Sequence, residues 1–146
     1  MIKAVLFDCF GVVLDIMRNT RHPDTIALLG DLKGKYKLAM VSNVSSRRSL
    51  DDRFLPGELD ELFDVVVASG DVGFEKPSPH IFTMTAEKLQ VNPEECIFID
   101  DIETFCRAAE AVGMQSFHFT TPIESAVALR QMLLDAPSID NPLKKH

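Results

Sequence analysis

The sequence predicts an α/β fold built on a doubly wound, parallel five-stranded sheet with helices on both faces. Five short apolar runs are spread along the 146 residues, and helical patterns fill the gaps between them. Most of the runs lack polar alternation, which is typical of parallel strands covered on both faces. Strand and helix patterns that alternate indicate βαβ units with right-handed crossovers. The five predicted strands are Ile2–Phe7, Leu38–Val41, Val65–Ala68, Cys96–Ile99 and Ser116–Phe119.

The predicted helices are recognised by apolar residues that recur every three or four positions. The first is expected over Thr25–Lys37 and leads into the second strand. Ser78-Pro79 and Thr121–Glu124 carry helix-start signals, an N-cap followed by proline and a capping box, and Gly113 is a helix stop. The apolar stripes are Leu28, Leu29 and Leu32; Phe82, Ala86 and Leu89; and Phe105, Ala108, Ala109 and Val112.

The length and composition indicate one ordinary globular domain, with a core over 1–136 and a loosely ordered tail over 137–146. A net charge of −7 disfavours nucleic acid and anionic membranes as partners. No apolar run approaches the roughly 18 residues of a membrane span, and the start lacks a signal-peptide cleavage site. The three cysteines have no CxxC spacing, so we expect buried free thiols and a cytoplasmic location.

Polar side chains follow the predicted strands, where open α/β sheets bind their ligands. Because the carboxyl ends of parallel strands meet at one edge, these side chains are expected to converge there. We interpret Asp71 mainly as a turn residue. The candidates are Asp8 after the first strand, Ser42 and Asn43 after the second, Ser69-Gly70-Asp71 and Lys76 after the third, and Asp100 and Asp101 after the fourth.

Three carboxylates with one lysine and one hydroxyl suit a magnesium site that handles phosphate. Mg²⁺ prefers oxygen ligands and is usually bound by one or two carboxylates, water and substrate phosphate. Aspartate is a competent nucleophile that can form an aspartyl-phosphate. Ser42 could donate to a phosphate oxygen, and Lys76 could neutralise the phosphoryl group. The plainer alternatives are that Ser42 is a helix N-cap and that Lys76 is a surface lysine.

Four stretches in order make the chain resemble the haloacid dehalogenase-like (HAD) hydrolases. The similarity runs from about Ile2 to Leu134, and each stretch follows a predicted strand. The stretches are Met1–Gly11 with Phe-Asp-Cys-Phe-Gly, Leu38–Asn43 with Val-Ser-Asn, Gly73–Pro79 with Glu-Lys-Pro, and Ile97–Asp101 with Ile-Asp-Asp.

The resemblance implies a role for each matching residue. Asp8 would be the nucleophile and a metal ligand, and the carbonyl of Phe10 would be another ligand. Asp101 would be a direct ligand of Mg²⁺, and Asp100 a direct or water-mediated one. Ser42, Asn43 and Lys76 would bind the phosphate.

The chain departs from the family pattern at three places. Phe10 occupies the position where the family's phosphatases usually carry an Asp that acts as acid and base. Phe105 stands where the fourth motif often has Asn or Asp. Only Asp15–Arg21 is available between the first two motifs, where the most similar subfamily inserts a helical cap domain, so we expect a core without a cap.

These features leave three functions open. The leading one is a Mg²⁺-dependent phosphatase acting on a phosphorylated small molecule or protein, with a preference for activated or acyl phosphates. A homo-oligomer could supply a lid. The first alternative is a weakly active or inactive HAD-fold protein that binds a ligand or partner, as Phe10 and the missing cap suggest. The second is a 2-haloacid dehalogenase, which the Asp100-Asp101 pair disfavours.

Overall fold

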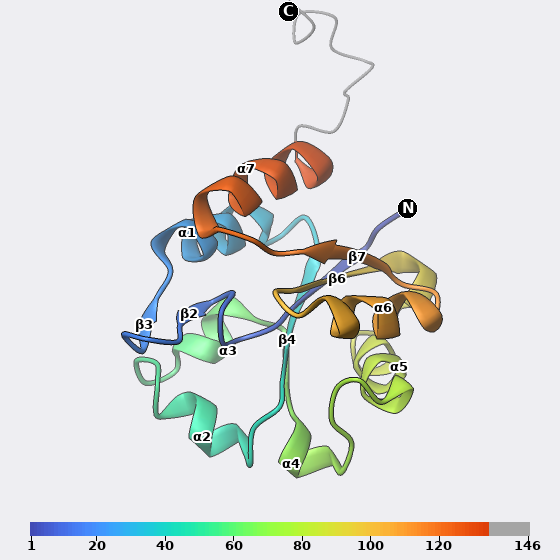
Figure 1. Cartoon of the computed structure of the whole chain (residues 1–146), viewed down its shortest axis with the longest axis horizontal. Coiled ribbons are helices and arrows are strands. Elements are labelled where there is room, and N and C mark those ends of the chain that lie inside the picture. Colours follow the sequence, from blue (N-terminus) through green and yellow to red (C-terminus); the bar gives the residue numbers. More distant parts are fainter. Residues whose placement is uncertain (135–146) are drawn as a thin grey trace, which may run out of the picture.

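A computed structural model describes residues 1–134, and the tail expected over 137–146 lies outside that range. Its central feature is a parallel five-stranded sheet in the order β5-β4-β1-β6-β7 (Figure 1). The predicted α/β fold with a five-stranded parallel sheet is therefore confirmed. Its strands are β1 (Ala4–Phe7), β4 (Lys37–Ser42), β5 (Val65–Ala68), β6 (Cys96–Asp100) and β7 (Gln115–His118).

Strand β1 lies in the middle of the sheet and is buried along its whole length. Its last residue, Phe7, pairs with Met40 of β4 and with Ile99 of β6. The residues that follow these three positions therefore leave the sheet at one edge. This register brings the chain after β1, β4 and β6 together, as the sequence predicted.

Two apolar layers cover the two faces of the sheet. Val5 and Phe7 pack in one layer with α1 (Pro23–Leu32) and α7 (Pro122–Leu133), which lie side by side (Figure 1). Ala4 and Leu6 pack in the other layer with α5 (Pro79–Lys88) and α6 (Glu103–Ala111). The apolar residues of β1 therefore serve both faces, which is why its sequence lacks polar alternation.

The helix expected over Thr25–Lys37 is shorter at its end than predicted. It starts at Pro23 and ends at Leu32, and Lys37 already begins β4. Gly34 adopts φ = +86°, a left-handed conformation that ends helices and favours glycine. The prediction over-extended the helix because it gave this glycine no weight.

Several short elements were not predicted. The segment Asp15–Arg21 contributes to a hairpin of β2 (Leu14–Asp15) and β3 (Thr20–Arg21), two residues in each strand. Only a short loop and this hairpin separate the end of β1 from α1, so the described chain has no cap domain there. The remaining elements are α2 (Arg47–Asp51), α3 (Glu58–Leu62), α4 (Ser69–Val72) and the 3₁₀ helix η1 (Pro93–Glu95).

The three cysteines are all buried and free. Burial raises the pKa of the Cys9 thiol to about 12 and the pKa values of Cys96 and Cys106 to about 11. None of them therefore has the thiolate character of a reactive cysteine. Within residues 1–134, no helix combines the length and apolar character needed to cross a bilayer.

Candidate active site

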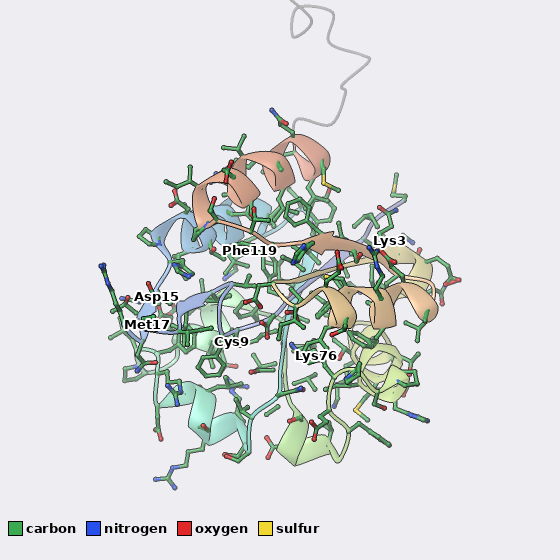
Figure 2. All side chains as sticks on the ribbon, viewed as in Figure 1. Lys3, Cys9, Asp15, Met17, Lys76 and Phe119 are labelled. Atoms are coloured by element: carbon green, nitrogen blue, oxygen red, sulfur yellow. The ribbon has the colours of Figure 1, made fainter. Side chains whose placement is uncertain are left out.

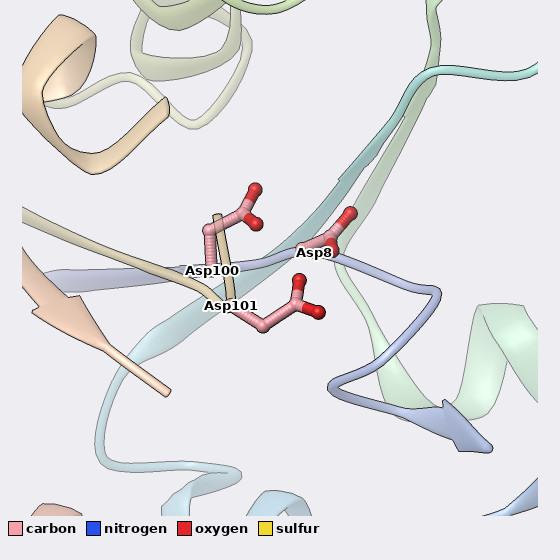
Figure 3. Close-up of side chains that lie close together, drawn as sticks. All are labelled: Asp8, Asp100 and Asp101. Atoms are coloured by element: carbon pink, nitrogen blue, oxygen red, sulfur yellow. The ribbon is translucent and has the colours of Figure 1, made fainter. Parts of the chain in front are cut away.

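Three carboxylates lie together at the edge of the sheet (Figure 3). Asp8 directly follows β1, Asp100 is the last residue of β6, and Asp101 comes next along the chain. One oxygen from each carboxylate lies within 4.8 Å of the other two. Asp8 and Asp100 are buried, while Asp101 is half-buried. The structure therefore brings together the three acidic residues that the sequence predicted for a metal site.

Lys76 is the positive charge of this cluster, and it is buried rather than on the surface. Its Nζ donates to Asp8 Oδ1 at 2.7 Å and to Asp100 Oδ2 at 2.9 Å. Only 2% of the residue is exposed, and the side chain points into the centre of the molecule (Figure 2). The ammonium also lies 5.3 Å from the ring centroid of Phe105. The alternative of a surface lysine is wrong.

Asn43 holds the main chain of Lys76. Its Oδ1 accepts from the Lys76 N–H at 2.9 Å, and its Nδ2 donates to the Lys76 carbonyl at 3.0 Å. These two bonds join the end of β4 to the loop that carries Lys76. The amide of Asn43, predicted to bind phosphate, is thus already engaged in positioning Lys76.

Ser42 is the last residue of β4 and is fully buried. Among the described residues its Oγ has no hydrogen-bond partner. The interpretation of Ser42 as a helix N-cap is wrong, because Ser46 fills that role for α2 and accepts from the Ser49 N–H. A buried hydroxyl without a partner is costly, so Ser42 is available to a ligand in the pocket.

A pocket of about 190 Å³ opens above these groups. Neither Asp100 nor Asp71 lines this pocket. Asp71 Oδ2 instead accepts a hydrogen bond from the Arg47 N–H at 2.7 Å. That contact agrees with a structural role for Asp71. The lining residues are Asp8, Phe10, Ile16, Ser42, Asn43, Lys76, Asp101, Ile102 and Phe105.

The charges of the site are unbalanced among the described residues. Three carboxylates face a single ammonium, and burial raises the pKa of Asp8 to about 7 although Lys76 opposes the shift. Burial, and to a smaller degree the charge of the neighbouring Asp100, also raises the pKa of Asp101. Both shifts have burial as their largest cause, so the ionised carboxylates are disfavoured here and an added cation would stabilise them.

A divalent cation fits this site. Asp101 Oδ1 is buried and accepts no hydrogen bond from residues 1–134. By contrast, both oxygens of Asp100 accept hydrogen bonds, Oδ1 from the Ile102 N–H at 2.9 Å and Oδ2 from Lys76 Nζ. The donor set consists of oxygen atoms, as Mg²⁺ requires. The free oxygen of Asp101 favours it over Asp100 as a direct ligand.

Gly11 lies against the carboxylate cluster, and the sequence reasoning missed it. A Cβ at this position would lie 2.4 Å from Asp101 Oδ2, and the residue adopts φ = +89°. Glycine therefore lets the main chain after Phe10 approach the carboxylate closely. The available signal was the glycine itself, three residues after Asp8. Ile16 and Arg53, described below, carried no comparable signal in the sequence.

We expect Gly11→Ala to weaken magnesium binding about tenfold or more, because the methyl group must displace the Asp101 carboxylate. Both this change and Gly34→Ala should cost about 1–3 kcal/mol through left-handed backbone strain. Gly34 has φ = +86° and open space around its missing Cβ, so it is the matched control. The measurement is the rise of Tm with added MgCl₂. An equal magnesium response in both variants would contradict the role of Gly11.

Comparisons with known proteins agree with this geometry. Residues 18–113 match the family model "haloacid dehalogenase-like hydrolase". Acyl-CoA dehydrogenase family member 10 of Mus musculus is 36% identical over 128 residues, which cover 88% of this chain and 12% of that protein. Sesquiterpene phosphatase astK of Aspergillus oryzae is 32% identical over 108 residues, covering 73% of this chain and 55% of that protein. Further curated relatives are also named phosphatases.

The chain spans about half the length, or less, of these curated relatives. Among solved structures, a HAD family enzyme from Bacteroides thetaiotaomicron in complex with magnesium and inorganic phosphate superposes with a TM-score of 0.71. It is 18% identical, and the match covers 82% of this chain and 95% of that one. At this identity the likeness supports the fold alone.

Proposed function

The chain belongs to the haloacid dehalogenase-like hydrolase family, and on that premise we propose that it is a Mg²⁺-dependent phosphatase that forms an aspartyl-phosphate on Asp8. One observation carries this proposal. Lys76 is buried between Asp8 and Asp100, and the same cluster contains oxygens of Ser42 and Asp101 that have no hydrogen-bond partner within residues 1–134. The phosphatase names of the relatives support the same reaction class.

In this proposal an oxygen of Asp8 attacks the phosphorus atom of the substrate. The bond from phosphorus to the leaving-group oxygen breaks, and its electron pair goes to the leaving group. Water then attacks the phosphorus of the aspartyl-phosphate, and the bond from phosphorus to the Asp8 oxygen breaks. The protons of the water stay on the inorganic phosphate that is released, and the Asp8 carboxylate is restored. Two displacements on one phosphoryl group replace a single difficult one.

The other residues position and neutralise the phosphoryl group. Lys76 donates to Asp8 and faces the phosphoryl oxygens, Ser42 Oγ donates to one of these oxygens, and Asn43 keeps the Lys76 main chain in place. The carboxylates of Asp8 and Asp101 and the carbonyl of Phe10 would hold Mg²⁺, with Asp100 bound directly or through water. The cation would supply charge neutralisation for the transferring group.

The proposed substrate is a phosphorylated small molecule or protein whose leaving group needs little protonation. Phe10 can neither give nor take a proton, so activated or acyl phosphates should react better than alkyl phosphates. We further propose a cytoplasmic location, since three free thiols suit a reducing compartment. A lid from a second copy would suit the open pocket.

The decisive experiment measures hydrolysis of acetyl phosphate and p-nitrophenyl phosphate with MgCl₂ or with EDTA, for the wild type and Asp8→Asn. We expect turnover that needs magnesium and that Asp8→Asn abolishes. Rapid quenching should trap phosphate on the wild-type protein only. Turnover in EDTA, or an active Asp8→Asn variant, would refute the mechanism.

Phe10 also favours a second candidate, a HAD-fold protein that binds a phosphorylated ligand without turning it over. In that case phosphate would bind with magnesium and raise Tm, while no substrate would be hydrolysed. Halide release from 2-haloacids tests the dehalogenase alternative in the same preparations.

A further inference from the structure

The upper wall of the active-site pocket is apolar. Its floor carries the charged groups already described, while Phe10, Ile16, Ile102 and Phe105 line the rest. Two of these side chains are unusually exposed for isoleucine, Ile16 at 62% and Ile102 at 45%. Exposed apolar side chains at the mouth of a pocket are typical of binding sites.

Ile16 belongs to the hairpin turn, and polar contacts tie this hairpin to the segment after α2. Arg21 of β3 pairs with Glu58, the first residue of α3. Arg53 Nη1 donates to Asn19 Oδ1 at 2.8 Å. Within the turn, Asp15 Oδ1 accepts from the N–H of Met17 at 2.8 Å. These contacts hold the turn in a defined position, and the turn in turn holds Ile16 beside the pocket.

Arg53 also connects this hairpin to the pocket wall. Its guanidinium carbon lies 4.9 Å from the centroid of the Phe10 ring. A cation over an aromatic face is attracted by it, so the same arginine that binds Asn19 also orients the Phe10 ring. Arg53 therefore links Phe10 to the turn of the hairpin that carries Ile16.

We propose that Phe10, Ile16, Ile102 and Phe105 form a leaving-group subsite that selects phosphorylated substrates with an apolar leaving group. This inference rests on the proposed phosphatase function. The pocket of about 190 Å³ has room for the phosphoryl group and the first atoms of the leaving group, since a cavity of roughly 150 Å³ is filled by one benzene. A longer chain would continue over Ile16 and Ile102 at the mouth.

Acyl phosphates of increasing chain length test this subsite without changing the chemistry of the leaving group. Acetyl and octanoyl phosphate both release a carboxylate, so they differ in apolar surface alone. Each methylene that becomes buried should raise kcat/KM up to about fourfold. We expect octanoyl phosphate to be preferred by roughly 10- to 100-fold at equal magnesium concentration. Octylphosphonate should likewise bind more tightly than methylphosphonate, by calorimetry and without turnover.

Ile16→Ser should lower the octanoyl-to-acetyl ratio of kcat/KM about three- to tenfold. Met17→Ser is the matched control, because Met17 is 91% exposed on the same turn (Figure 2) and does not line the pocket. Its ratio should equal that of the wild type. Ile102→Ser provides a second test on another segment, independent of the hairpin.

The outcomes separate the subsite from the phosphatase function. Equal kcat/KM for both acyl phosphates, with equal phosphonate affinities, would overturn the subsite and leave the phosphatase intact. If neither acyl phosphate is hydrolysed, the phosphatase proposal fails, and chain-length-dependent phosphonate binding still supports or overturns the subsite. If Ile16→Ser instead dissociates an oligomer in sedimentation with an unchanged ratio, the rim is an interface between copies, and the proposal is wrong.

Discussion

Replacing Lys76 by methionine is expected to lower the free energy of unfolding by about 3–5 kcal/mol when magnesium is absent. The change removes the shared partner of Asp8 and Asp100, at 2.7 and 2.9 Å, and leaves two buried carboxylates without their counter-charge. Methionine fills most of the volume of lysine, so the loss comes chiefly from charge. The measurement is urea unfolding in EDTA.

Magnesium should recover part of this loss, because a cation held by Asp8 and Asp101 would supply positive charge to the same carboxylates. Lys35→Met is the control, since Lys35 is exposed and its side chain makes no hydrogen bond or ion pair within the described chain. It should change stability by less than about 0.5 kcal/mol. A loss below 1 kcal/mol in Lys76→Met would contradict the view that Lys76 neutralises the site. Retained phosphatase activity would contradict its role in binding phosphate.

The parts of the fold that the sequence predicts well are those set by local patterns. The strands around Val5, Met40 and Ile99 are apolar runs without alternation, and burial on both faces explains that pattern. The site follows from the same fact. Once these strands are parallel, Asp8, Ser42 and Asp100 must leave one edge together.

The features that the sequence did not predict depend on contacts between residues that lie far apart along the chain. The strands of the hairpin have two residues each, and the hairpin is held by Arg21 on Glu58 and by Arg53 on Asn19. No local pattern signals such pairs. No local pattern signals the burial of Lys76, because its partners Asp8 and Asp100 lie 68 and 24 residues away. The role of Ile16 at the pocket depends on the hairpin and was missed for the same reason.

Replacing Phe10 by aspartate is expected to raise the turnover of alkyl phosphates about 10²- to 10⁴-fold, the usual contribution of a general acid and base. Phe10 lines the pocket two residues after Asp8, at the position where the resemblance to HAD phosphatases places that group. Acetyl phosphate should gain much less, because its carboxylate leaving group departs without a proton. The measurement is kcat/KM for both substrates at neutral pH.

The control for this change is Phe10→Asn, which removes the ring and matches the size of aspartate without transferring a proton. If the gain comes from proton transfer, Phe10→Asn stays near the wild type on alkyl phosphates. If it comes from opening the pocket, the two variants gain alike, and the acid–base argument is wrong.

Arg53 would act on an aspartate introduced at position 10. Its guanidinium carbon lies 4.9 Å from the centroid of the Phe10 ring, so its positive charge would favour the ionised form of the new carboxyl group. Phe10→Asp combined with Arg53→Gln should therefore protonate an alkyl leaving group better than Phe10→Asp alone. The ratio of kcat/KM for alkyl phosphates between these two variants is thus the sharpest test of whether a missing acid limits the native protein.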